Sequence, residues 1–336
     1  MIPATAHFVW LGERFPFLLG ISILSAAKFG GFTRVVVHCD SDIRHTPGWS
    51  VCMDDPRIVW QPLNEKVLLN YLESIGADLF SLYQRLTQPA ARSNIIRLAI
   101  LYKEGGVYLD TDVITVNPFT RVRTESFFCG AEHIALPASL YNTRSPVPWI
   151  KAAGRLVLRD ILRRTPRGWL LFKKLNRMYP EVVNNAVMGA SPGCTEVYKL
   201  LAKMLTLPED RQTKRFALGT HLLESAVTEG EIDIRVLPPS AFFPLGPEIS
   251  EHWFKRSSHI HLDDFISSET ICIHWYASVR TRKFVAKATF DWVNIHRDTI
   301  PICRLVHMVR CSDTNAEKGR LEEGYDAVLK RISFRA

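Results

Sequence analysis

The sequence predicts an α/β fold built on a Rossmann-like, largely parallel sheet, and three observations support this. In the first 120 residues, short apolar runs alternate with helical patterns, as in βαβ units. The chain has 336 residues, of which 47% are hydrophobic and 23% charged, so it can bury a large core. An acidic pair, Asp110 and Asp112, directly follows an apolar segment, and such sheets bind ligands at the carboxyl ends of their strands.

The first βαβ unit follows from two apolar strands that flank an apolar helix. Gly30 and Gly31 end that helix, and the unit implies parallel strands joined by a right-handed crossover. A third strand and a long helical stretch come next. The predicted elements are a strand at 6–11, a helix at 17–29, and strands at 34–39 and 57–61, followed by helix at 64–85.

A helix over residues 90–102 leads to the acidic pair. Its apolar residues recur at one-turn spacing, and Gly105 and Gly106 supply the stop. Ser93, Asn94 and Arg97 fall on the opposite side of this helix, where they can contact sugar hydroxyls and phosphate. An exposed polar helix face is the alternative interpretation.

The strand after this helix is predicted to carry Asp110 and Asp112. Side chains alternate along a strand, so both would point the same way, about 7 Å apart. Such a pair can hold a hard divalent cation, Mn²⁺ or Mg²⁺, and present it to a diphosphate, as in a nucleotide-sugar site. A solvated acidic pair beside a turn is the alternative.

The second half of the chain is less regular. Four prolines, at 137, 146, 148 and 166, predict short pieces of chain that form an irregular, acceptor-facing insertion. Later strands are expected at 184–190, 232–237 and 270–275, with a helix at 195–205. We divide the chain into a nucleotide-sugar-binding half (1–120), an acceptor-side half of the same domain (121–290) and a helical, charged tail (291–336).

The formal net charge of +8 is concentrated in one segment. Residues 155–177 contain eight basic residues and one acid, Asp160, interleaved with leucines and aromatic residues. Basic amphipathic segments bind anionic membrane surfaces, where lipid-linked acceptors are found. A solvated basic helix that packs its leucines on the core is the alternative. We expect no nucleic-acid partner, because no nucleic-acid-binding module accompanies the charge.

The cysteines and the hydropathy of the sequence indicate in which cellular compartment the protein lies. The seven cysteines are scattered and form no Cys-x-x-Cys pair, which predicts reduced thiols in a cytosolic protein. No apolar stretch approaches the roughly 18 residues of a spanning helix, and the first strand begins almost at Met1. We therefore expect a cytoplasmic protein that binds the inner face of the membrane peripherally, if at all. A Golgi protein of this kind would need an N-terminal anchor, which is not seen in this sequence and which truncation could have removed.

Residues 91–112 resemble the signature of glycosyltransferases with a DXD sugar-binding region. This family includes initiating mannosyltransferases, α-1,4-galactosyltransferases, bacterial polysaccharide transferases and large glucosylating bacterial toxins. The toxins have an aspartate where this chain has Asn94, so a contact to sugar hydroxyls there would lack a charge. The resemblance continues at 2–3 and 7–12 and, more weakly, at 184–190, 237–244 and 273–278. The signature positions are Ser93, Asn94, Arg97, Gly105, Gly106, Tyr108, Leu109, Asp110 and Asp112.

The resemblance implies a GT-A fold and a retaining, metal-dependent glycosyltransferase. Its donor would be a UDP- or GDP-linked sugar, and its acceptor a hydroxyl of a polysaccharide, lipid-linked oligosaccharide or glycolipid. A transferase that modifies proteins is one alternative. A sugar-nucleotide-binding protein without catalysis is another, and the intact Asp110 and Asp112 argue against it.

The candidate site combines the residue patterns with this resemblance. Trp10 would stack on the nucleobase and Asp40 would bind ribose, although a core tryptophan and a turn aspartate are alternatives. His274 would complete the metal site, since an imidazole accepts manganese. The catalytic residues would be Asp110, Asp112, Arg97, Asn184 and Asn185, and the metal ligands Asp110, Asp112 and His274. The donor contacts would be Trp10, Asp40, Ser93, Asn94, Arg97, Tyr108, Asp110, Trp275, Ser278 and Lys283.

Overall fold

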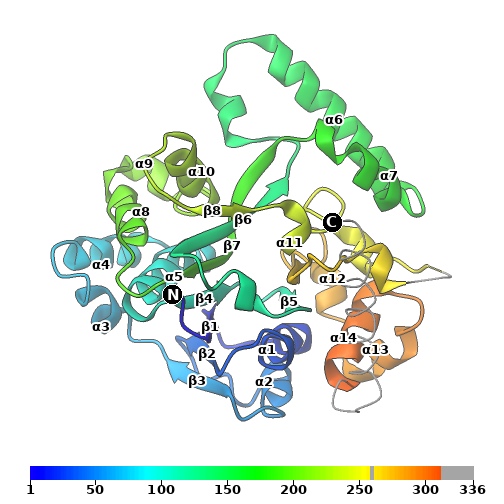
Figure 1. The fold of residues 1–336 in the computed structure, drawn as a ribbon, viewed down its shortest axis with the longest axis horizontal. Coiled ribbons are helices and arrows are strands. Elements are labelled where there is room, and N and C mark those ends of the chain that lie inside the picture. The colour runs from blue at the N-terminus through cyan, green and yellow to red at the C-terminus, as the bar shows by residue number, and fades with distance from the viewer. Residues whose placement is uncertain (258–260, 312–336) are drawn as a thin grey trace, which may run out of the picture.

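The computed structural model describes residues 1–257 and 261–311, and the predicted α/β fold with a Rossmann-like, largely parallel sheet is confirmed (Figure 1). In these two ranges a seven-stranded sheet has the order β3-β2-β1-β4-β7-β6-β8. The first four strands in this order are parallel, and β7 runs antiparallel to both β4 and β6. The strands are β1 Thr5–Trp10, β2 Arg34–Cys39, β3 Ile58–Pro62, β4 Gly106–Leu109, β5 Val113–Thr115, β6 Phe127–His133, β7 Glu181–Ala190, β8 Arg235–Leu237 and β9 Cys272–His274.

Helices cover both faces of this sheet (Figure 1). One apolar cluster joins α1, α2 and α14 to one face, and a second joins α4, α5, α8 and α10 to the other. Adjacent residues of β4 belong to different clusters, because side chains along a strand point alternately to the two faces of the sheet. The helices are α1 Phe17–Phe29, α2 Pro47–Cys52, α3 Glu65–Asn70, α4 Gly76–Arg85, α5 Pro89–Glu104, α6 Pro146–Arg164, α7 Gly168–Leu175, α8 Thr195–Thr206, α9 Glu209–Gln212, α10 Thr220–Thr228, α11 Pro239–Phe242, α12 Arg282–Val285, α13 Phe290–His296 and α14 Pro301–Cys311.

The βαβ unit predicted at the N-terminus is confirmed. Strands β1 and β2 pair in parallel from Thr5 with Arg34 to Trp10 with Cys39. The connecting α1 is apolar on nearly every side because the sheet covers one side of it, and α2 and α14 pack against it elsewhere. This arrangement brings the ends of β1, β2 and β4 to one edge of the sheet.

The turn from α5 into β4 depends on two glycines. Gly105 and Gly106 have φ of 65° and 101°, in the region that side chains with a Cβ rarely adopt. A Cβ on Gly106 would also lie 2.6 Å from the carbonyl oxygen of Thr5 and 2.9 Å from the His7 ring. The glycines that end α5, as predicted, therefore also allow β4 to lie close enough to β1 for the two strands to pair.

Two predictions about the helices are wrong. The helix expected over 64–85 is two helices, α3 and α4, with Glu73 at φ 36° between them. At the start of α4, a Cβ on Gly76 would lie 2.3 Å from the Leu69 carbonyl, so α4 turns back closely on α3. The irregular insertion after residue 120 instead contains α6, a helix of 19 residues. Its prolines lie in the first turn, where no intrahelical N–H bond is lost.

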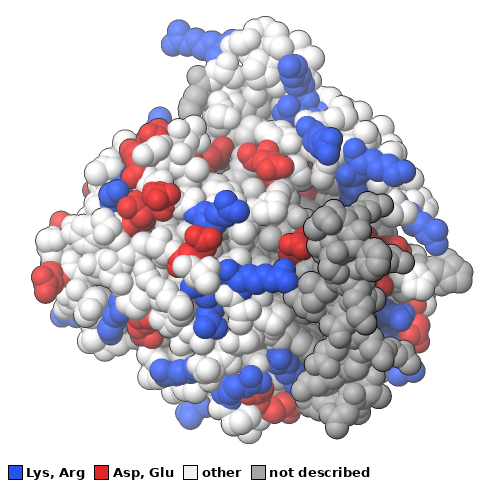
Figure 2. Space-filling view, in the orientation of Figure 1, with Lys and Arg blue, Asp and Glu red and all other residues white. Residues whose placement is uncertain are grey.

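Three features of the second half differ from the prediction or add to it. Strand β6 was not predicted, although it lies beside β7 in the central sheet. The strand expected at 270–275 is the short β9, which pairs with β5 outside that sheet. In the predicted tail, α13 and α14 are helical and α14 packs in the core, while residues 312–336 lie outside the described residues. Charges of both signs are scattered among uncharged residues on the visible face, with Lys and Arg gathered over α6 and α7 (Figure 2).

Candidate metal and donor site

The two aspartates lie at the end of β4, where the chain leaves the sheet. Strand β4 ends at Leu109, and the Asp110 N–H donates to the Ala186 carbonyl of β7 at 2.8 Å. The Val113 N–H donates to the Asp110 carbonyl at 3.0 Å, which closes a turn before β5. The pair therefore belongs to a turn, so the expectation that both share one strand face is wrong. The turn still directs both carboxylates to the same place.

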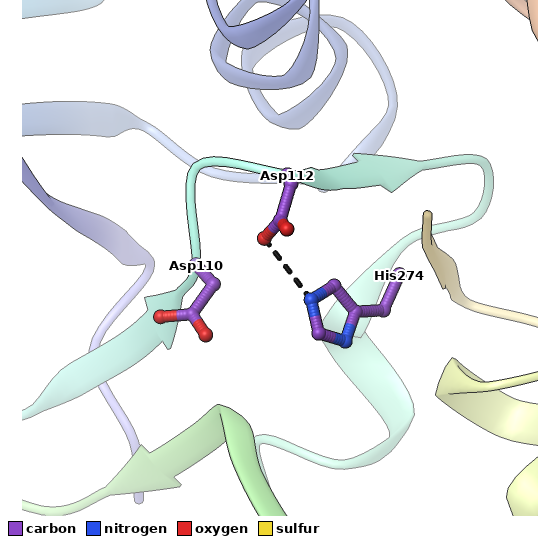
Figure 3. Close-up of side chains that lie close together, drawn as sticks. All are labelled: Asp110, Asp112 and His274. Atoms are coloured by element: carbon purple, nitrogen blue, oxygen red, sulfur yellow. Dashed lines mark hydrogen bonds and ion pairs between the residues drawn. The ribbon is translucent and has the colours of Figure 1, made fainter. Parts of the chain in front are cut away.

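His274 reaches these carboxylates through the two-stranded β5–β9 sheet. The antiparallel register places His274 opposite Val113, and the Trp275 N–H donates to the Asp112 carbonyl at 3.1 Å. The His274 Nε2 lies 3.0 Å from Asp112 Oδ1 (Figure 3). One ligand atom each of Asp110, Asp112 and His274 lie within 4.8 Å of one another, so the three can hold a metal ion. Two carboxylates and an imidazole are a donor set suited to Mn²⁺ or Mg²⁺.

The charges in this group depend on one another. Burial raises the pKa of Asp110 above its ordinary value, and the nearby Arg97 guanidinium only partly opposes this. Burial acts in the same direction on Asp112, but His274 and hydrogen bonds, including one from the Ala277 N–H at 2.7 Å, bring the pKa of Asp112 below its usual range. Burial would lower the pKa of His274, yet Asp112 and Asp110 raise it overall. A divalent cation binds the deprotonated forms of these groups, so its binding would release protons from any that are protonated.

Arg97 of α5 fixes the position of the Asp110 carboxylate. Its side chain is 6% exposed, its Nη2 lies 3.0 Å from Asp110 Oδ1, and its Nη1 donates to the Asn185 carbonyl. The guanidinium stacks over the Tyr108 ring at 4.4 Å, and the Tyr108 hydroxyl donates to Asp110 Oδ1 at 2.7 Å. Ser93 Oγ lies 3.4 Å from that hydroxyl. These contacts make Arg97, Tyr108 and Ser93 positioning residues for Asp110, and contact of Arg97 with a donor stays a prediction.

The two asparagines of β7 have separate surroundings, because neighbours on a strand point to opposite faces. Asn185 Nδ2 donates to Asn94 Oδ1 at 2.9 Å, and the Thr220 hydroxyl donates to Asn185 Oδ1 at 3.2 Å. Asn184 is buried, donates to Glu132 Oε1 at 2.7 Å and accepts from the Ala186 N–H at 2.7 Å. The Asn184 amide therefore has partners inside the protein, and a substrate-orienting role for it stays a prediction.

Sequence reasoning missed Glu132 and gave Tyr276 no role. Tyr276 packs its ring on His274, with centroids 3.9 Å apart, and its hydroxyl donates to Glu132 Oε2 at 2.6 Å. Tyr276 has φ 56°, a conformation that a bulky residue rarely adopts, so the backbone here is strained. Glu132 is 6% exposed, and burial raises its pKa. A lone glutamate in the apolar strand 127–133 was the signal in the sequence.

The proposed nucleotide residues lie at the ends of two neighbouring strands. Trp10 ends β1, is half-buried and contacts Phe15 edge-on at a centroid distance of 5.2 Å. Asp40 follows β2 and accepts a hydrogen bond from the Gly12 N–H at 2.8 Å. The parallel strands β1, β2 and β4 end at the same edge of the sheet. Trp10 and Asp40 therefore lie at the edge where Asp110 lies. Their contacts with base and ribose stay predictions.

Of the three late donor contacts, one is wrong. Trp275 is fully buried, and its indole N–H donates to Ser22 Oγ of α1 at 3.3 Å, so it cannot cover a diphosphate. Strand alternation explains this, because the residue after His274 must point to the other face. Ser278 is exposed next to Ala277, whose N–H binds Asp112. Lys283 is exposed on α12, and its contact with the donor stays a prediction.

Tyr276→Phe is expected to weaken Mn²⁺ binding about tenfold, because residues that orient a metal ligand typically contribute 10- to 100-fold. The change removes the hydroxyl bond to Glu132 but keeps the ring on His274. Titration calorimetry with Mn²⁺ measures the effect. Tyr83→Phe is the matched control, since the Tyr83 hydroxyl donates to Glu65 at 2.8 Å in α3 and α4. Equal affinity in both variants would show that Tyr276 does not position His274.

Comparison with known proteins agrees with the resemblance found in the sequence. Residues 40–128 match a family model described as the glycosyltransferase sugar-binding region containing a DXD motif. The matched range contains Asp110 and Asp112. A human alpha-1,4-N-acetylglucosaminyltransferase is 31% identical over 152 residues, which cover 40% of this chain and 41% of that protein. The chain thus spans less than half the length of this relative.

Two solved structures show a distant overall similarity. The PaToxG glycosyltransferase aligns over 68% of this chain and 70% of its own, with 18% identity and a TM-score of 0.44. Mouse xyloside xylosyltransferase 1 in its apo form aligns over 80% of this chain and 96% of its own, with 11% identity and a TM-score of 0.45.

Proposed function

We propose that the protein is a glycosyltransferase that moves a sugar from a UDP- or GDP-linked donor to a hydroxyl of a polysaccharide, lipid-linked oligosaccharide or glycolipid. The convergence of Asp110, Asp112 and His274 at the carboxyl edge of the sheet carries this proposal. Nucleotide ligands of α/β sheets bind at this edge. The family match over 40–128 supports the same chemistry.

Asp110, Asp112 and His274 would hold Mn²⁺ or Mg²⁺. The residues present fit such an ion, because each ligand is oriented by contacts of its own. Arg97 and Tyr108 orient Asp110, the Ala277 N–H orients Asp112, and Tyr276 orients His274. When bound, the cation would neutralise the charge that develops on a departing nucleoside diphosphate. The chain itself would hold both carboxylates in place before the donor arrives.

We further propose that transfer retains the anomeric configuration. The resemblance to retaining families supports this, as does the α linkage in the name of the human relative. Where a sugar is α-linked to its nucleotide, an α-linked product means retention. Glu132, a buried acid near the site, has both oxygens engaged by Asn184 and Tyr276, which suits a structural support rather than a nucleophile.

A nucleotide-sugar panel tests the proposal. With Mn²⁺ present, the matching donor is expected to raise the melting temperature, because a ligand at 100 times its Kd stabilises the native state by about 2.7 kcal/mol. EDTA should abolish the shift. The same donor is then offered with a lipid-linked oligosaccharide, a glycolipid or a protein extract, and NMR of the product gives the anomer.

Each part of this experiment has an outcome that would contradict part of the proposal. A donor shift that persists in EDTA would rule out the metal site as the donor anchor. Sugar incorporation into proteins alone would identify the enzyme as a protein-modifying transferase. Donor binding without transfer or hydrolysis under any condition would leave only a sugar-nucleotide-binding protein, and a β-linked product from an α-linked donor would exclude retention.

A further inference from the structure

The α6–α7 hairpin, residues 146–175, lies at one edge of the molecule, away from the central sheet (Figure 1). Its inner side is fixed to the protein by ion pairs. Arg159 pairs with Glu248 at 3.2 Å, and Arg163 pairs with Glu251 at 2.7 Å. Lys173 of α7 donates to the backbone carbonyl of Phe265. Several cations of the basic segment therefore have internal roles.

The outer side of α6 is apolar, whereas a surface helix ordinarily presents polar residues to the solvent. Val147, Ile150, Gly154, Val157 and Ile161 follow one another at spacings of three and four, so they form one stripe. Every member is exposed; Ile150 is 70%, Val157 61% and Ile161 56% exposed. Nine of the 17 large hydrophobic residues exposed in the described ranges lie between 141 and 178. A concentration of this kind marks an interaction surface.

Exposed cations border this stripe. Arg164 is exposed about one helical turn after Ile161, at the end of the stripe. Lys151, Arg167 and Lys174 are also exposed. The acid of this segment, Asp160, is already engaged by Arg159 and Arg163. Figure 2 shows the resulting cluster of Lys and Arg over α6 and α7. The hairpin thus presents apolar side chains within a positive rim.

A groove of about 340 Å³ opens where the two helices meet. Ile161, Leu170 and Leu171 give it apolar walls, and Arg167 and Lys174 lie at the same groove. This combination suits an amphiphile with a phosphate headgroup and an acyl chain.

We propose that the outer side of the α6–α7 hairpin docks on an anionic phospholipid bilayer. The apolar stripe would enter the boundary between headgroups and acyl chains, and the rim cations would contact lipid phosphates. Charge selects this occupant over a second copy of the chain, which would set the same cations against one another. Within the ranges that the structure describes, no helix is long and apolar enough to cross a membrane. The contact proposed is therefore peripheral.

Vesicle sedimentation tests the docking surface with the full chain. At low salt the protein is expected to sediment with vesicles of equal phosphatidylglycerol and phosphatidylcholine, and to stay in the supernatant with phosphatidylcholine alone. A variant with Arg164→Gln, Arg167→Gln and Lys174→Gln should bind about 10²-fold more weakly, since each cation near such a surface contributes about fivefold. Ile150→Ser with Ile161→Ser should weaken binding as well. Raised salt should resemble the triple variant.

The controls separate docking from general loss of structure. Lys66→Gln with Val67→Ser changes an exposed cation and an exposed apolar residue on α3 and should bind vesicles as wild type. All variants should keep the wild-type melting temperature. Wild-type protein that stays in the supernatant with anionic vesicles overturns the proposal, as does unchanged binding of both hairpin variants. A dimer in solution that Ile150→Ser and Ile161→Ser dissociate would assign the stripe to self-association instead.

Discussion

Asp112→Asn is expected to lower turnover by about 10²- to 10⁴-fold, because a neutral amide is a poor ligand for a hard cation. The fold should survive, since the amide oxygen can still accept the hydrogen bond from the Ala277 N–H. Asp110→Asn should cause a similar loss. Initial rates of donor turnover with saturating Mn²⁺ give the comparison, and thermal melting confirms that the variants are folded.

Asp54→Asn provides the matched control, since this carboxylate is exposed and lies outside the proposed site. It should turn over donor at the wild-type rate. If Asp112→Asn does the same, or if EDTA leaves wild-type activity unchanged, then the carboxylates do not act through a metal ion.

Arg97→Ala is expected to affect both stability and activity. It removes the ion-pair partner of Asp110 and leaves that carboxylate uncompensated. We expect the free energy of unfolding to fall by roughly 3 kcal/mol, the lower end for breaking a buried pair, because the Asp110 side chain is 28% exposed. Urea denaturation measures this loss, and turnover should fall with it because Asp110 would no longer be fixed.

A pH signature separates the electrostatic role of Arg97 from a merely structural one. Burial raises the pKa of Asp110, and Arg97 opposes that rise. Without Arg97 the pKa should rise further, so more of the carboxyl is protonated at a given pH and Mn²⁺ binds more weakly. Affinity should recover as the pH increases, because the metal binds the deprotonated form.

Arg92→Ala is the control for this prediction. Arg92 lies on the same helix, but it donates to the Leu86 carbonyl and stacks over Tyr83, away from Asp110. Its loss should leave the pH dependence of Mn²⁺ binding as in wild type. Equal effects of the two substitutions on affinity and its pH dependence would show that Arg97 does not control the ionisation of Asp110.

Local patterns were enough for the parts of the site that are close in the sequence. The apolar stripe of α5, the two glycines and the acidic pair lie within residues 89–112, and the sequence predicts all three, although the pair lies in a turn and not on the predicted strand. His274 came from the resemblance, because no local pattern connects it with Asp112, 162 residues away. Trp275 is buried on the side opposite His274, because consecutive residues of an extended chain point to opposite faces.

Burial and pairing could not be predicted from spacing alone. Asn184 and Asn185 look equivalent in the sequence, but Glu132 on β6 engages one and Asn94 on α5 the other. The basic segment likewise contains cations of two kinds, and only their partners distinguish them. Arg163 reaches Glu251, whereas Arg164, the next residue, faces outward. Each distinction depends on contacts between distant parts of the chain.

The β5–β9 pairing has a consequence for the order of folding during synthesis. Strands β1 to β8 precede residue 238, so a nascent chain can complete the central sheet before β9 has been translated. His274 and the Ala277 N–H join Asp112 only afterwards, through contacts of high contact order that form slowly. A ribosome-bound intermediate can therefore have the complete central sheet while it still lacks His274, the third residue of the proposed metal site. If the proposed site is correct, the capacity to bind the metal is acquired among the last steps of folding.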